Sequence, residues 1–314
     1  MSSFGLRGEF EMFVKDAATG RIKRRLHFAN TILDVGMDGI GYNWATRNAC
    51  SVGTNNTPPT TSQTGLIALH ATTDALSKSG APIAADPNNG YMFGRSYTYS
   101  FNPGQITAAI SEVGIHSGNA IDGAIRYFCR TLIKDENDNP STITVLPNEY
   151  LDVIHTVFVI PDTQDTVFSF SLDGVTYTGT SRPSNIQSWG FGIGLGLPSN
   201  GWAPTAQIRA LYYNENAQLG EITGAPTTTK TTLGNIINYQ RAAYTAGTYY
   251  TDTLCTFGVD YGDAPFKACI VNNANISGQD AIGNTSCQIV FDKPIPKDNK
   301  TAFVLTVRRS WSRA

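Results

Sequence analysis

The chain has 314 residues, of which 41% are hydrophobic and only 15% are charged, and its net charge is −2 at pH 7. This much apolar material excludes a disordered chain, and the balanced charge provides no bulk attraction to nucleic acid or to an anionic membrane. Few charged residues, with many Gly, Thr, Asn and Ser residues in their place, favour short strands and turns over long surface helices.

The first predicted element is a β-hairpin. Phe10, Met12 and Val14 alternate with other residues, and residues 16–20, DAATG, turn the chain back. The returning strand carries the basic run RIKRR in residues 21–25. Since edge strands are often guarded by Lys and Arg, this run favours a solvated strand edge over a phosphate contact.

A short helix and a long loop are predicted next. Residues 30–44 read NTILDVGMDGIGYNW and predict a short helix, which three glycines weaken. Residues 52–66 read VGTNNTPPTTSQTGL and predict an extended loop. In that loop we expect Gly53 to permit a turn, and Pro58 and Pro59 to stiffen the chain.

Strands dominate the rest of the chain. Alternating apolar residues predict strands through residues 90–160, and Asp173-Gly174 is the strongest hairpin signal. Residues 190–197 alternate Gly with Phe, Ile and Leu, and they predict a packed strand because the third glycine of the nucleotide-binding pattern is missing. Residues 205–262 are rich in Tyr, Thr and Asn, and the chain closes with a predicted strand around residues 303–307.

The cysteines and the N-terminus indicate the folding compartment. The five cysteines are widely spaced and form no CxxC pair, which predicts buried free thiols in a reducing cytosol. The first residues, MSSFGLRGEF, lack the apolar core of a signal peptide, and no apolar run is long enough to span a bilayer. We therefore expect neither export by a signal peptide nor a membrane span. The thiols are those of Cys50, Cys129, Cys255, Cys269 and Cys287.

Catalytic patterns are weak. The four histidines occur singly, and no nucleophile elbow or P-loop is found. Carboxylates do pair, as in Asp34 with Asp38, and a glycosidase stays open on this basis, but turn and cap roles are commoner for such residues. The turn in residues 135–140, DENDNP, carries Pro140 where a calcium loop needs Gly. The sequence therefore predicts no enzyme, no metal site and no cofactor.

Several short phrases follow one another along nearly the whole chain. NTILDVGMDGI precedes SVGTNNTPPTTSQTGL, and then come SEVGIHSG with CRTLIKD, YLDVIHTVF, LDGVTYTGTSRPSNI and finally FDKPIPKDNKTAFVLTVRRSWSRA. This ordered set resembles structural proteins of tailed bacteriophage virions, especially tail and tail-appendage proteins. The resemblance implies an oligomeric virion component, made in the host cytoplasm, whose partners are copies of itself, other virion proteins and, in one alternative, a host surface receptor. It carries over no catalytic residues.

For the fold, we predict a mostly β protein of antiparallel β-sandwiches with a few short helices. Residues 1–200 are expected to form a β-sandwich, and residues 201–314 a second β region that packs with the first as one unit or separately. The predicted assembly contacts are Gly190, Gly192, Gly194, Trp202 and Trp311. The predicted receptor or carbohydrate surface consists of Tyr212, Tyr213, Tyr249 and Tyr250, because Tyr combines a large apolar ring with a polar tip.

Four functions remain open at this point. The first is a structural protein of a phage tail, in a collar, baseplate or fibre. The second is a receptor-binding or carbohydrate-binding module at the tail tip, which the Tyr-rich residues 205–262 favour. The third is a capsid decoration or head-fibre protein. The fourth, a virion depolymerase, is the weakest, since the chain lacks the long repeats of a β-helix.

Overall fold

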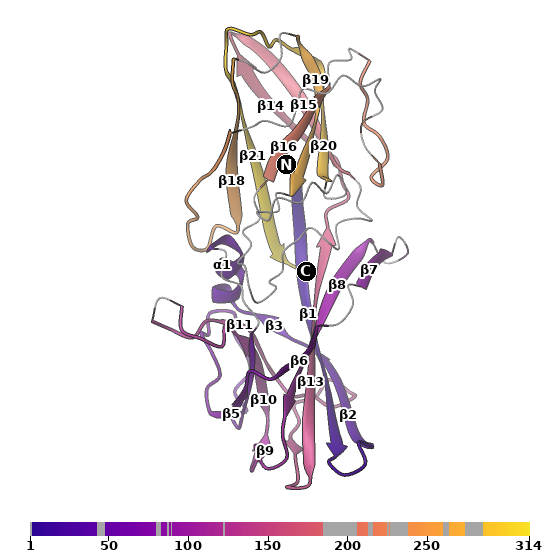
Figure 1. The fold of residues 1–314 in the computed structure, drawn as a ribbon, viewed down its shortest axis with the longest axis vertical. Coiled ribbons are helices and arrows are strands. Elements are labelled where there is room, and N and C mark those ends of the chain that lie inside the picture. Colours follow the sequence, from indigo (N-terminus) through magenta and orange to yellow (C-terminus); the bar gives the residue numbers. More distant parts are fainter. Residues whose placement is uncertain are drawn as a thin grey trace.

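The computed structural model describes residues 2–42, 48–79, 83–86, 88, 90–121, 123–184, 206–212, 216–224, 226, 238–259, 264–273 and 285–314. Within these ranges the chain is mostly β, and the helix α1 (Asp34–Tyr42) is short, which confirms the predicted fold class. The molecule is elongated, with strands running along its long axis (Figure 1).

A long sheet forms the spine of the molecule. Its central strand, β1, pairs antiparallel with β13 from Phe4↔Pro161 to Asp16↔Glu149. The first residues of β1 also pair in parallel with the last strand, β21, so the two ends of the chain lie side by side. Among the described residues the strand order is β17 (Asn238–Arg241), β18 (Tyr250–Phe257), β21 (Phe303–Arg313), β1 (Ser2–Asp16), β13 (Glu149–Pro161), β8 (Met92–Phe101) and β6 (Leu76–Ser79), with β2 (Ile22–Ala29) on β1 and β7 (Ile83–Asp86) on β8.

The first sandwich packs one part of this spine against a second sheet. Phe10, Met12 and Val14 of β1 are fully buried, as their alternation predicts, and they belong to the first hydrophobic core. The second sheet has the order β3 (Thr31–Ile32), β11 (Tyr127–Leu132), β10 (Glu112–His116), β4 (Ala49–Gly53) and β5 (Leu69–Thr73). A small ladder joins β9 (Ala109–Ile110) to β12 (Ile143–Thr144).

The second sandwich packs the other part of the spine, β18 and β21, against a third sheet. Its core contains a cluster of aromatic rings, with the centroids of Phe266 and Phe303 5.3 Å apart and those of Phe266 and Phe291 6.0 Å apart. Asp173 and Gly174 have φ angles of 50° and 76° at the tip of the predicted hairpin, which is confirmed. The third sheet has the order β14 (Thr166–Leu172), β15 (Val175–Pro183), β20 (Thr285–Ile295), β19 (Phe266–Asn273) and β16 (Ala206–Tyr212).

The two hydrophobic cores place the division between the sandwiches between Val159 and Tyr177, before the boundary that the sequence predicts near residue 200. The first core runs from Phe4 to Val159 and adds Trp311, whereas the second runs from Tyr177 to Val307. Strand β15, which the sequence assigns to the first region, pairs with β20 of the second. The division follows strand pairing, and the short polar connection between β13 and β14 carries no composition signal that marks it as a boundary.

Two local predictions are confirmed by the structure. Strand β2, with the basic run, pairs with β1 at the margin of the spine, and its Arg25 contacts Glu11. All five cysteines are buried free thiols. The predicted strand in residues 190–197 lies outside the described residues.

Candidate functional site at the junction of the two sandwiches

Helix α1 occupies the junction between the sandwiches (Figure 1). Asp34 stands in its first turn, where a carboxylate is favoured by the helix dipole, and Met37 and Ile40 enter the first core. Gly36 faces β11 so closely that a Cβ at this position would lie 2.1 Å from the carbonyl oxygen of Phe128. A glycine that lowers helix propensity is therefore required by the packing of the helix on the sheet.

The C-terminal strand β21 is hydrogen-bonded to this helix through two side chains. Trp311 donates its indole N–H to the carbonyl oxygen of Met37 over 3.0 Å. Arg313 donates from Nε to the carbonyl oxygen of Ile32 over 2.7 Å and from Nη2 to the Asp34 carboxylate. Strand β21 contributes Phe303, Leu305 and Val307 to the second core, and its last residues are thereby bonded to the helix of the first sandwich.

The segment before β18 also holds the helix through two tyrosine side chains. The Tyr249 hydroxyl donates to Oδ1 of Asp34 over 3.0 Å, and the Tyr244 hydroxyl donates to Oδ1 of Asp38 over 2.7 Å. The Tyr244 ring also stacks on Trp311, with centroids 5.7 Å apart. Asp34 and Asp38 lie four residues apart on one helix face, so both carboxylates meet tyrosine donors from the segment that leads into β18.

The protonation of these groups follows from their contacts. Burial opposes ionisation of Asp34, but hydrogen bonds from Arg313 and Tyr249 outweigh it and hold the pKa of the carboxyl below its ordinary value. Burial, together with the Asp38 carboxylate, raises the pKa of Tyr244 well above that of a free tyrosine. At neutral pH the carboxylate of Asp34 is an acceptor and the Tyr244 hydroxyl is a donor. These groups therefore suit a role in holding the helix in place rather than in acid–base chemistry. We call the set of Asp34, Asp38, Tyr244, Tyr249, Trp311 and Arg313 the clasp.

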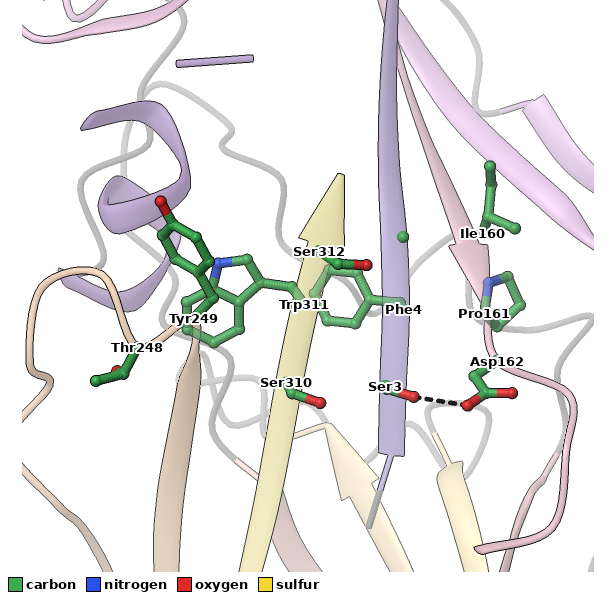
Figure 2. A pocket seen from close by; sticks show the side chains of 11 residues that line it. Ser3, Phe4, Ile160, Pro161, Asp162, Thr248, Tyr249, Ser310, Trp311 and Ser312 are labelled. Carbon is green, nitrogen blue, oxygen red and sulfur yellow. Dashed lines mark hydrogen bonds between the residues drawn. The ribbon is translucent and has the colours of Figure 1, made fainter. Parts of the chain in front are cut away.

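A groove of about 580 Å³ runs beside the clasp, where β1, β21 and the end of β13 meet. Figure 2 shows the indole of Trp311 between the rings of Tyr249 and Phe4. Ser3 donates its hydroxyl to Oδ2 of Asp162 over 2.9 Å across the other side of the groove. The polar atoms of Tyr249, Trp311 and Asp162 are thus already engaged within the chain.

The structure brings together only part of the predicted site. The sequence predicts Trp311 as an assembly contact, whereas its side chain is 3% exposed because Phe4, Tyr244 and helix α1 enclose it. Tyr249 is half-buried and lines the same groove. Tyr250 lies on β18, where the Arg308 guanidinium stacks on its ring at 3.7 Å.

The other predicted residues are not placed at this site. Tyr212 belongs to β16, and nothing is described of its side chain. The residues that fall outside the described ranges are Gly190, Gly192, Gly194, Trp202 and Tyr213.

Sequence reasoning missed the helix carboxylates and their donors. It assigned Asp34 and Asp38 to turn or cap roles and did not pair them with Tyr244 or Arg313. A signal was present, because NTILDVGMDGI and the closing SWSRA are the two end phrases of the ordered set. These two phrases contact each other through Trp311 and Arg313.

The loop in residues 54–66 is anchored by a buried ion pair. The side chains of Arg130 and Glu112 are both fully buried and joined over 2.8 Å. Arg130 also donates to the side chain of Gln63 over 2.8 Å and to the carbonyl oxygen of Thr57 over 2.9 Å. The Pro-containing loop is therefore tied to β10 and β11 through charged hydrogen bonds.

Three further observations bear on function. In the part of the chain that the structure describes, no helix has the length and apolar character of a membrane span. Over the same ranges, no three His, Cys, Asp or Glu side chains are grouped so that they could hold a metal ion. No family model matches the chain, and no curated protein or solved structure is significantly similar to it.

Proposed function

We propose that this protein is a structural component of a bacteriophage virion, placed in the tail as part of a collar, baseplate or fibre. In this role it acts by oligomeric assembly and not by catalysis. One observation carries the proposal: the phrases that resemble phage tail proteins lie in contacting elements. They occupy the helix α1, the loop after β4, and the strands β10, β11, β13 and β21.

The contacts between these phrases support reading them as one signature. Arg130 of the CRTLIKD phrase binds Glu112 of SEVGIHSG and Gln63 of the loop phrase. Arg313 of the closing phrase binds Asp34 of the helix phrase. Residues that contact one another in a fold are expected to occur together in related sequences. The ordered phrases therefore correspond to one set of contacting elements, which includes the junction between the two sandwiches.

An exposed apolar patch supports assembly. Leu254 and Val304 are 37% and 51% exposed on the adjacent strands β18 and β21. We call these two residues the outer patch. Exposed apolar side chains on paired strands suit a contact with a second copy.

Mass spectrometry of purified phage particles tests the virion assignment. We expect the chain in intact virions, and cryo-electron microscopy is expected to place it in the tail. Absence from intact particles contradicts the proposal, and immunogold labelling confined to heads favours a capsid decoration or head-fibre protein instead.

Analytical ultracentrifugation of the purified chain tests self-assembly. We expect the wild-type chain to be oligomeric and the double variant Leu254→Asp/Val304→Asp to dissociate. Val167→Asp is the matched control, because Val167 is 66% exposed on β14, in another sheet. A wild-type chain that stays monomeric at every concentration contradicts assembly through this face.

A receptor-binding module at the tail tip is the second candidate. The observation in its favour is the half-buried Tyr250, whose ring and stacked Arg308 lie on the outer side of the spine. An aromatic ring beside a cation is a common recognition surface. Purified protein that adsorbs to host cells and blocks infection supports this function, and no adsorption at high concentration contradicts it.

A further inference from the structure

A second groove lies in the first sandwich. It has a volume of about 510 Å³ and lies where β4 begins and where β5 and β10 end. Its lining includes Asn48, Thr72, Asp74, Leu76 and Asn119. The volume falls within the range of roughly 300–1,000 Å³ that is typical of small-molecule sites.

The polar side chains of this groove differ from those of the junction groove. Among the described residues, the side chains of Asn48, Asp74 and Asn119 form no hydrogen bond or ion pair, and Asp74 and Asn119 are exposed. In the junction groove, by contrast, Asp162 and Tyr249 are already bonded within the chain. Free hydrogen-bonding groups in a concave site are available to a ligand, whereas satisfied groups are not.

A buried relay ends at Thr72 on the wall of this groove. The backbone N–H of Gly118 donates to Nδ1 of His116 over 3.1 Å, which leaves the hydrogen of the neutral ring on Nε2. His116 Nε2 lies 2.8 Å from the Ser51 hydroxyl, and Ser51 lies 2.7 Å from the hydroxyl of Thr72. Ser51 and His116 are buried, so these hydrogen bonds hold the Thr72 hydroxyl in place on the wall of the groove.

We infer that this groove binds a small polyhydroxylated ligand, of the size of one or two sugar rings. A carboxylate accepts hydrogen bonds from neighbouring hydroxyls, and the two amides both donate and accept. Leu76 provides an apolar wall for the C–H face of a ring. A calcium ion takes six to eight oxygen ligands, and Asp74 supplies the single carboxylate among the described residues that line this groove. A calcium site is therefore disfavoured here. This inference does not depend on the proposed function.

Saturation-transfer difference NMR of the full chain tests the inference, with glucose, galactose, mannose, rhamnose and N-acetylglucosamine as the probes. We expect at least one sugar to bind with millimolar affinity, as suits an exposed site with few hydrogen bonds. Asp74→Asn is expected to weaken that sugar roughly tenfold, because a charge-assisted hydrogen bond is lost. Thr72→Ser should keep the affinity, and Thr72→Val should reduce it.

Two matched control variants show whether a sugar binds in this groove or elsewhere on the chain. Asp162→Asn makes the same substitution in the junction groove, and Asp138→Asn makes it at an exposed ion pair with Lys134. Both are expected to bind the sugar as the wild type does, and circular dichroism checks that every variant is folded. The inference is overturned if none of the five sugars binds, if Asp74→Asn binds unchanged, or if Asp162→Asn alone weakens binding.

Discussion

The indole N–H of Trp311 donates to the carbonyl oxygen of Met37 over 3.0 Å, and this bond joins two residues 274 positions apart. It couples the last strand of the second sandwich to the helix of the first. Since Trp311 is almost fully buried, the bond exists without competition from water.

Trp311→Phe tests this bond. The substitution keeps an aromatic ring but leaves the Met37 carbonyl without its donor, so we expect a loss of about 2 kcal/mol in the free energy of unfolding. Urea denaturation followed by circular dichroism measures it. Ser312→Ala, at the exposed neighbouring position, is the control and is expected to change stability by less than about 0.5 kcal/mol.

The ion pair between Asp34 and Arg313 can be isolated by a double-mutant cycle. Their side chains are 40% and 30% exposed, so solvent screening limits the interaction and we expect a coupling free energy of about 1 kcal/mol. The variants are Asp34→Asn, Arg313→Gln and the double substitution, compared by urea denaturation. A coupling near zero would show that the clasp depends on Trp311 and the tyrosines alone.

Glu112→Ala is expected to be strongly destabilising. It leaves the fully buried Arg130 guanidinium without its carboxylate, which costs about 3–5 kcal/mol in buried pairs. The amides of Ile67 and Ala68, which donate to Glu112, should also exchange with solvent faster in hydrogen-exchange mass spectrometry. Lys134→Ala, which removes an exposed pair with Asp138, is the control and should have little effect.

Gly36→Ala separates helix propensity from packing. In an exposed helix this change stabilises by about 1 kcal/mol. Here the added Cβ would lie 2.1 Å from the backbone oxygen of Phe128, so we expect destabilisation by about 2 kcal/mol or more. Thermal unfolding measures the outcome. Gly224→Ala, where a Cβ meets its nearest atom at 3.6 Å, should be neutral, and a stabilising Gly36→Ala would refute the close approach.

His116 predicts a pH dependence of stability. Burial lowers the pKa of this histidine to about 4, below the ordinary value of 6.5. Between these values the unfolded chain binds more protons than the folded chain, so stability is complete above pH 6.5 and falls as the pH drops. We expect this residue to contribute a loss of about 2 kcal/mol between pH 7 and pH 5.

Urea midpoints of wild type and His116→Gln at pH 7 and pH 5 measure this contribution. The variant cannot titrate at this position, so its loss of stability between the two pH values should be smaller than that of the wild type. Equal losses in both proteins would contradict the assignment to His116.

The sequence alone determined the fold class and much of the local structure. The alternation of Phe10, Met12 and Val14 predicted the buried face of β1, and Asp173-Gly174 predicted a hairpin, since both signals arise from neighbouring residues. The wide spacing of the cysteines likewise indicated free thiols.

Only the tertiary structure decided where the two sandwiches divide and what lies at their junction. The parallel pairing of Ser2–Leu6 with Arg309–Arg313 joins the two ends of the chain, and no local pattern encodes a contact of that sequence separation. For the same reason Trp311 was predicted at a surface but is buried against α1, and Asp74 was overlooked in a groove that three strands build together. Periodicity shows which side of a strand is apolar, but what covers that side depends on how distant segments pack.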